Sequence, residues 1–236
     1  TSRSSNHAQK GGRFMLFSSI PFLFYFLPLV LIAYFAVPGR FKNLILLLAS
    51  LFFYAWGEPK YVVLMLISIV QGYAFGLLIE KYRGGKAAKL FLSLSVLVSL
   101  GLLAYFKYAD FFLSSVNAVA GLSLPLLKLT LPIGISFYTF QVLSYVIDVY
   151  RGETAAQRSF IDLAAYVSLF PQLIAGPIVR YSDVAAELSD RTHSLSGAAD
   201  GARRFVTGLC KKVLLANQFG SLAAACKQAQ EASALF

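Results

Sequence analysis

The chain has 236 residues, of which 58% are hydrophobic and 14% are charged, and its mean hydropathy is +0.67. Soluble domains carry about 25% charged residues, so this composition excludes an ordinary soluble domain and predicts an integral membrane protein. The net charge of +10 does not indicate nucleic-acid binding, because Lys and Arg occupy the gaps between apolar segments. There they determine topology and meet anionic lipid. We therefore expect membrane lipid as a partner and no nucleic acid.

The first half of the chain alternates between apolar segments and short polar gaps. Residues 1–14 are polar and unlike the apolar stretch after them, so we interpret them as leader or tag residues without ordered structure. Four apolar spans are then predicted, at residues 16–37, 44–56, 61–79 and 90–106. A weaker candidate is broken up by Ser114, Ser115, Asn117 and Gly121, and we expect an interfacial or re-entrant helix over residues 111–127.

Polar side chains recur along residues 131–151, a stretch long enough to cross a bilayer at about 1.5 Å per residue. At about 100° per residue, one sector of such a helix holds Gly134, Tyr138, Gln141, Ser144, Tyr145 and Asp148. Lipid cannot satisfy these groups, so we expect the stripe to face protein or water. We interpret it as the lining of an internal polar cavity. Hydrogen bonding to neighbouring helices alone is the alternative.

Residues 160–179 form a second informative segment, which is apolar but contains Pro171, Gly176 and Pro177 near its middle. A broken helix at membrane depth is tolerated only against protein or a cavity. Gln172 and Arg180 flank the break. The candidate residues of a substrate path are therefore Tyr138, Gln141, Ser144, Asp148, Gln172 and Arg180. The alternative is a simple kinked hairpin with Arg180 at the lipid headgroups.

The chain becomes polar after Tyr181, and an amphipathic helix is predicted over residues 200–219. One face carries Arg203, Arg204, Lys211 and Lys212, and the other carries Val206, Leu209, Val213 and Leu214. This pattern favours an interfacial helix on anionic lipid, or a basic rim for a phosphate-bearing donor or an acidic carrier protein. We thus predict a transmembrane core over residues 15–181. Residues 182–236 would form a cytoplasmic polar loop, the basic helix and the start of a further segment.

Topology follows from the basic loops. If the loops containing Arg40, Lys42 and residues 81–89 are cytoplasmic, the N-terminus lies outside and the positive-inside rule is obeyed. His7 and His193 lie far apart in polar segments, and Cys210 and Cys226 have no metal-ligand spacing. We therefore expect no metal site and two plain thiols.

Four strings of residues are similar to those of the membrane-bound O-acyltransferase family, and in particular to its bacterial alginate O-acetyltransferase branch. They are MLFSSIPFLFYFLPLV, LLASLFFYAWGEPKYV, LPIGISFYTFQVLSYVIDVYRG and SLFPQLIAGPIVRY, in this order between residues 15 and about 219. The resemblance implies an all-α ring of membrane helices in the bacterial inner membrane. About five to seven transmembrane or re-entrant helices would belong to this chain.

The resemblance also implies a function, namely O-acetylation of a secreted polysaccharide such as alginate. The acyl donor would be a thioester, acetyl-CoA or an acyl carrier, with no tightly bound cofactor, and exported proteins would be partners. Family members carry a catalytic histidine in a later apolar segment, whereas His193 lies in the polar string RTHSLSG. We therefore expect that residue beyond Phe236, and an N-terminal fragment that is inactive by itself. A transporter or channel, and a non-catalytic scaffold of a secretion complex, are the alternatives.

Overall fold

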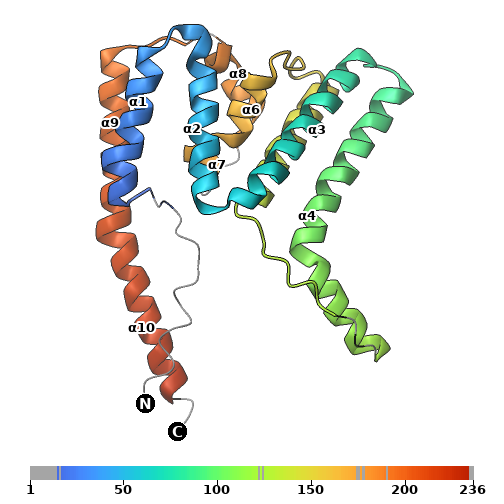
Figure 1. The fold of residues 1–236 in the computed structure, drawn as a ribbon, viewed down its shortest axis with the longest axis vertical. Helices are drawn as coiled ribbons and strands as arrows, with labels where there is room; N and C mark the ends of the chain where they lie inside the picture. Colours follow the sequence, from blue (N-terminus) through green and yellow to red (C-terminus); the bar gives the residue numbers. More distant parts are fainter. Residues whose placement is uncertain are drawn as a thin grey trace. The chain divides into compact units, whose positions relative to one another are not determined.

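The computed structural model describes residues 15, 17–121, 123, 125–173, 176, 179–189 and 191–233. The described residues are mainly helical and contain no strand, which confirms the predicted all-α class (Figure 1). The chain divides into two compact units, the first made mainly of Leu29–Asp190 and the second of Leu16–Pro28 with Arg191–Phe236. The predicted leader at residues 1–14 lies outside the described residues.

Unit 1 begins within α1 (Leu27–Ala36), which a short 3-10 turn (Gly39–Phe41) separates from α2 (Lys42–Gly57). Pro59 begins a second 3-10 turn (Pro59–Tyr61), which leads into α3 (Val62–Lys81). A proline has no amide hydrogen and fixes its own φ, so it fits the first position of a helical turn and ends the helix before it.

One continuous helix, α4 (Lys86–Ala120), replaces the two elements predicted at residues 90–106 and 111–127. The prediction of a separate interfacial helix is therefore wrong. Residues 107–110, which join the two predicted elements, are Lys, Tyr, Ala and Asp. All four are compatible with a helix, because none is Gly or Pro. At about 1.5 Å per residue, 35 residues extend beyond the roughly 30 Å of a hydrocarbon core.

The striped segment forms α5 (Ile135–Arg151), which packs mainly against α3 and α4. The helix begins at Ile135, later than the predicted start at residue 131, because Gly134 has a left-handed φ of 76°. The axes of α3 and α5 approach closely at two glycines. A Cβ on Gly72 would lie 2.6 Å from Cγ1 of Val142, and one on Gly76 would lie 2.7 Å from the Tyr145 hydroxyl. Only glycine allows this contact.

The broken segment forms α6 (Phe160–Ser168) and the single turn α7 (Phe170–Leu173). The break falls at Leu169, because Pro171 cannot donate the hydrogen bond that would continue α6. The freed amide of Phe170 donates instead to the buried Ser50 hydroxyl of α2, at 3.1 Å. Pro177, the other predicted cause of the break, lies outside the described residues.

The polar stretch after Tyr181 is predicted as a loop, but its first part forms α8 (Tyr181–Ser189), which packs on α5 and α6. Asp183 in its first turn stabilises the positive end of the helix dipole.

Unit 2 contains a π-helical turn (Pro21–Phe26) and a helical stretch that is longer than the one predicted at residues 200–219. This stretch runs through α9 (Leu195–Cys210), a π-helical turn (Lys211–Ala216) and α10 (Asn217–Ser233) without a break. Ser194 begins it by accepting a hydrogen bond from the amide of Gly197, as an N-cap does.

Candidate functional site

The polar stripe of α5 is buried in unit 1. Tyr138 is 0% exposed, Gln141 2% and Asp148 3%, whereas Ser144 is half-buried. The stripe thus faces protein, as expected of polar groups that lipid cannot satisfy. Its role as the lining of a substrate path stays a prediction.

Among the described residues, four buried side-chain atoms have no hydrogen-bond partner, and all four belong to predicted site residues. They are the Tyr138 hydroxyl, Oε1 of Gln141, Oδ2 of Asp148 and Nε2 of Gln172. Buried polar groups are nearly always satisfied, since leaving one without a partner costs about 1–3 kcal/mol. Two of these atoms are able to donate a hydrogen bond and two accept one. Such a set suits a polar molecule that enters the protein.

The hairpin of α6 and α7 brings Gln172 to the first turn of α5. A Cβ on Gly134 would lie 3.1 Å from the carbonyl oxygen of Leu173, so the backbones of the two segments nearly touch there. Tyr138 begins the next turn of α5, and its own amide donates to the Gly134 carbonyl at 3.0 Å. The tip of the hairpin and the first half of the stripe therefore belong to the same end of α5.

The other end of α5 carries charged residues. Arg151 and Arg180 each place Nη1 3.7 Å from one of the two carboxylate oxygens of Glu153. Both arginine side chains are 59% exposed, so these contacts are weak in themselves. Asp148 is buried about one turn before the end of α5, within the electrostatic reach of both arginines. One glutamate thus contacts two guanidinium groups near a buried carboxylate.

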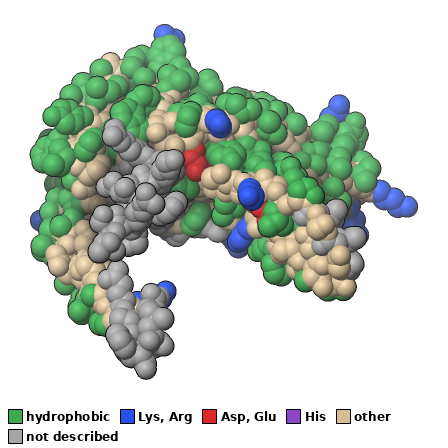
Figure 2. Space-filling model, turned by 60° about the horizontal axis from the view of Figure 1, so that its bottom comes forward, with side chains coloured by type: hydrophobic (Ala, Val, Ile, Leu, Met, Phe, Trp, Pro, Cys, Tyr) green, Lys and Arg blue, Asp and Glu red, His purple; other side chains and the backbone are tan. Residues whose placement is uncertain are grey.

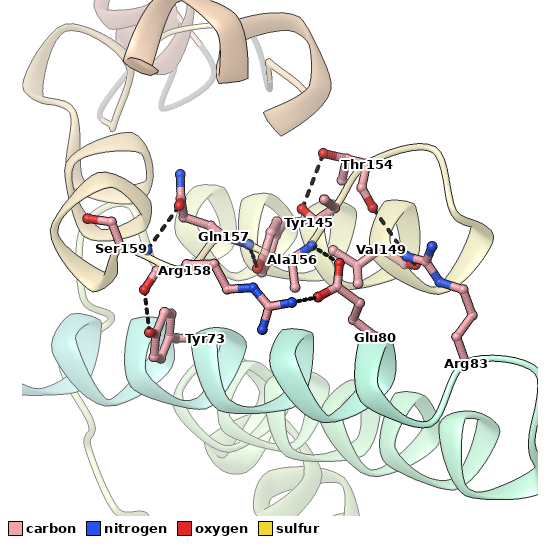
Figure 3. A network of polar contacts seen from close by, with 11 residues as sticks. Tyr73, Glu80, Arg83, Tyr145, Val149, Thr154, Ala156, Gln157, Arg158 and Ser159 are labelled. Carbon is pink, nitrogen blue, oxygen red and sulfur yellow. Dashed lines mark hydrogen bonds and ion pairs between the residues drawn. The ribbon is translucent and has the colours of Figure 1, made fainter.

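A network of hydrogen bonds fixes the loop after α5 onto the end of α3 (Figure 3). Glu80 of α3 accepts from the amide of Ala156 at 2.9 Å and pairs with Arg158, while the Tyr73 hydroxyl donates to the Arg158 carbonyl at 2.7 Å. Arg83 donates to the carbonyl of Val149 at 2.9 Å.

Gln157 joins both ends of the hairpin to α5. Its amide nitrogen Nε2 donates to the Tyr181 hydroxyl at 2.7 Å, and its Oε1 accepts from the amide of Ser159 at 3.0 Å. The backbone amide of Gln157 donates to the Tyr145 hydroxyl at 2.9 Å. The residues that flank this segment, Ser159 and Tyr181, therefore lie at the same end of α5.

The sequence interpretation missed the residues that hold this site together. Glu80, Gln157 and Arg158 are far apart in the sequence and have no local pattern that would connect them. Gly72 and Gly76, by contrast, form a G-x-x-x-G spacing that is typical of closely packed membrane helices, and this signal was present in the sequence. Within the described residues, no group of three or more His, Cys, Asp and Glu side chains is placed to hold a metal ion.

The outer surface of unit 1 carries many exposed apolar side chains. Along α4, Leu90 is 65% exposed and Leu97 is 69% exposed. Two described helical stretches, Pro59–Lys81 and Lys86–Val119, are long and apolar enough to cross a bilayer. Figure 2 shows hydrophobic side chains over much of the visible surface, with Lys and Arg only at scattered points. Exposed apolar helices together with buried polar side chains are typical of a helical membrane protein.

The chain is similar to several curated proteins. The chain is 45% identical to a probable alginate O-acetylase AlgI from Pseudomonas syringae pv. tomato, over 90% of this chain and 42% of that protein. It is 44% identical to one from Azotobacter vinelandii, over 90% of this chain and 44% of that protein. A peptidoglycan O-acetyltransferase from Helicobacter pylori is 35% identical over 86% of this chain and 45% of that protein. No family model and no solved structure matches the chain.

The chain is therefore similar, over 90% of its own length, to alginate O-acetylases, which supports the resemblance to the membrane-bound O-acyltransferase family. The resemblance predicted from the four strings is confirmed. The chain spans less than half the length of these three curated relatives.

Proposed function

We propose that this chain is part of an enzyme that transfers an acetyl group from a thioester donor to a hydroxyl group of a secreted polysaccharide. The observation that carries the proposal is the row of four buried polar atoms without partners, along α5 and at the tip of the hairpin. The names of the relatives, alginate O-acetylase and peptidoglycan O-acetyltransferase, support this reaction and this kind of acceptor. They also favour it over the transporter and scaffold hypotheses.

The reaction sets the demands on the site. A sugar oxygen attacks the acyl carbon, the carbon–sulfur bond breaks, the hydroxyl loses its proton to a base and the sulfur leaves as a thiol or thiolate. Negative charge develops on the carbonyl oxygen and requires hydrogen-bond donors. The Tyr138 hydroxyl and Nε2 of Gln172 are such donors. We assign the proton-accepting role to no residue of this chain.

Gln141 and Asp148 offer the complementary atoms. Oε1 of Gln141 and Oδ2 of Asp148 accept hydrogen bonds, so each suits a hydroxyl or an amide N–H of a substrate. Ser144 is half-buried between them on the same stripe, and its hydroxyl can either donate or accept a hydrogen bond. In this proposal the row orients the two reactants along α5.

Arg180, together with Arg151, would hold an anionic part of the donor. Both guanidinium groups already face one carboxylate, that of Glu153, so an incoming phosphate or carboxylate would replace it. Acetyl-CoA and an acylated carrier protein both carry such a group, and either fits this end of α5.

We place the protein in a bacterial inner membrane, as a multi-pass protein with its N-terminus outside. The apolar surface of unit 1 supports a position within the bilayer. The hydrogen bond from Arg83 to Val149 brings the end of α3 beside the end of α5, so the basic loop after α3 and Arg151 share one side. The positive-inside rule then makes that side cytoplasmic. Exported polysaccharide-modifying proteins would act with it on the other side.

The sharpest test compares two buried tyrosines, each changed to phenylalanine in the protein that carries this chain. Tyr138→Phe removes a hydroxyl without a partner, while Tyr54→Phe removes one that donates to the carbonyl of Ile133 at 2.9 Å. We expect Tyr138→Phe to lower the rate of polysaccharide acetylation roughly 100-fold, the usual effect of losing one oxyanion donor. Its stability should be unchanged or higher. Tyr54→Phe should lose about 1 kcal/mol of stability.

The measurements are acetyl transfer to the isolated polysaccharide and thermal unfolding in detergent. Normal acetylation by Tyr138→Phe, at normal stability, would remove this hydroxyl from the site. If Gln172→Leu were also fully active, the proposed role of the buried row would be wrong.

A further inference from the structure

The long helical stretch of unit 2 has an amphipathic surface that the described residues leave exposed. From Leu195 to Lys227, every described side chain is exposed except that of Leu209, which is half-buried. Large apolar side chains are among the exposed ones, with Val206 54% exposed, Leu214 65% and Phe219 66%. Exposed apolar groups in such number mark a surface that binds something.

The charge of this stretch indicates the partner. Between residues 201 and 226 it carries four basic residues and no acidic one. The basic residues are Arg203, Arg204, Lys211 and Lys212, and the ion pairs formed within the described part of the chain include none of them. A helix with basic groups on one side and apolar groups on the other is the type that lies in the headgroup region of an anionic bilayer.

We propose that the segment from Leu195 to Ser233 is an interfacial helix that binds the anionic cytoplasmic leaflet. Its apolar face, with Val206 and Leu214, enters the boundary of the acyl chains. The basic residues contact lipid phosphates at the level of the headgroups, because Lys and Arg have long stems that reach outward from a shallow helix. A lipid surface is preferred to a protein partner because it complements both the charge and the exposed apolar side chains at once.

Two positions on α9 allow the proposal to be tested directly. Val206 lies on the apolar face, and Gly208 lies about 200° around the helix on the basic face. A Cβ on Gly208 would meet no atom within 4 Å, so a cysteine is accepted there. The native thiols Cys210 and Cys226 are both exposed and are replaced by serine, along with any cysteine elsewhere in the protein.

The experiment labels Val206→Cys or Gly208→Cys with an environment-sensitive fluorophore, in the whole protein reconstituted in nanodiscs. The nanodiscs contain either phosphatidylcholine alone or an equal mixture with phosphatidylglycerol, and acrylamide serves as a neutral aqueous quencher. We expect the label at position 206 to shift to the blue and to resist quenching only with the anionic lipid. The label at position 208 should stay more accessible.

Added salt and substitution of the basic residues test whether electrostatic attraction causes the protection. An ionic strength of about 1 M, where the Debye length is about 3 Å, should reverse much of the protection. Each basic residue changed to Gln should reduce the ratio of bound to free helix roughly fivefold. Protection of position 206 that is equal in both lipids would mean that another part of the protein covers the helix. Equal quenching at both positions in both lipids would mean that the helix lies in water. Either outcome overturns the proposal.

Discussion

The two helical regions α5 and α9–α10 arrange similar residue types in opposite ways. On α5 the polar side chains Tyr138, Gln141 and Asp148 are buried, and the exposed aromatic side chains are Phe140 and Tyr150. On α9–α10 polar and apolar side chains alike are exposed. The difference teaches that one amphipathic pattern has two meanings in a membrane protein. It marks a helix buried in a bundle when most groups of the polar face are uncharged, and a surface helix when that face is basic.

The strongest way to break this comparison is to separate α5 from α3. A valine at position 76 would drive its side chain into Tyr145, whose hydroxyl lies 2.7 Å from the point that a Cβ at residue 76 would occupy. We expect Gly76→Val to cost about 3 kcal/mol, because overpacking at a close helix contact leaves no room to adjust. Thermal unfolding in detergent measures the effect. Gly101→Val on α4 is the matched control, since a Cβ there meets nothing within 4 Å, and it should change stability by less than about 0.5 kcal/mol.

A truncation of the same residue type in both regions sharpens the contrast. Val146 on α5 is 0% exposed, and Val206 on α9 is 54% exposed. Val146→Ala should cost about 2 kcal/mol, from two lost methyl groups and the cavity they leave. Val206→Ala should cost less than about 0.5 kcal/mol in detergent. Thermal unfolding of the two variants side by side checks this, and equal losses would show that α9 is packed as tightly as α5.

The sequence predicts the polar stripe of α5 well, because burial of a polar face leaves a local signature in the spacing of Tyr138, Gln141 and Asp148. It predicts the break before Pro171 for the same reason, since one residue causes it. The continuity of α4 could not be predicted, because the polar run around Lys107 resembles a loop in composition but is helical. The hydrogen bond from the Ala156 amide to Glu80 joins residues 76 positions apart, and no local sequence pattern predicts it.

The smallest expected effect concerns Arg83, which contacts the end of α5, and Arg203 on α9. Arg83 donates to the carbonyl of Val149 at 2.9 Å, and this carbonyl at the end of α5 also accepts from the Gly152 amide at 3.2 Å. Glutamine is too short to reach it, so Arg83→Gln should cost about 1 kcal/mol. Arg203→Gln on α9 removes a solvated charge and should leave stability in detergent within about 0.5 kcal/mol. A scan of both variants by thermal unfolding checks this. Should Arg203→Gln prove the more damaging of the two, α9 would have a protein partner in detergent, and the distinction between a bundle helix and a surface helix would fail at α9.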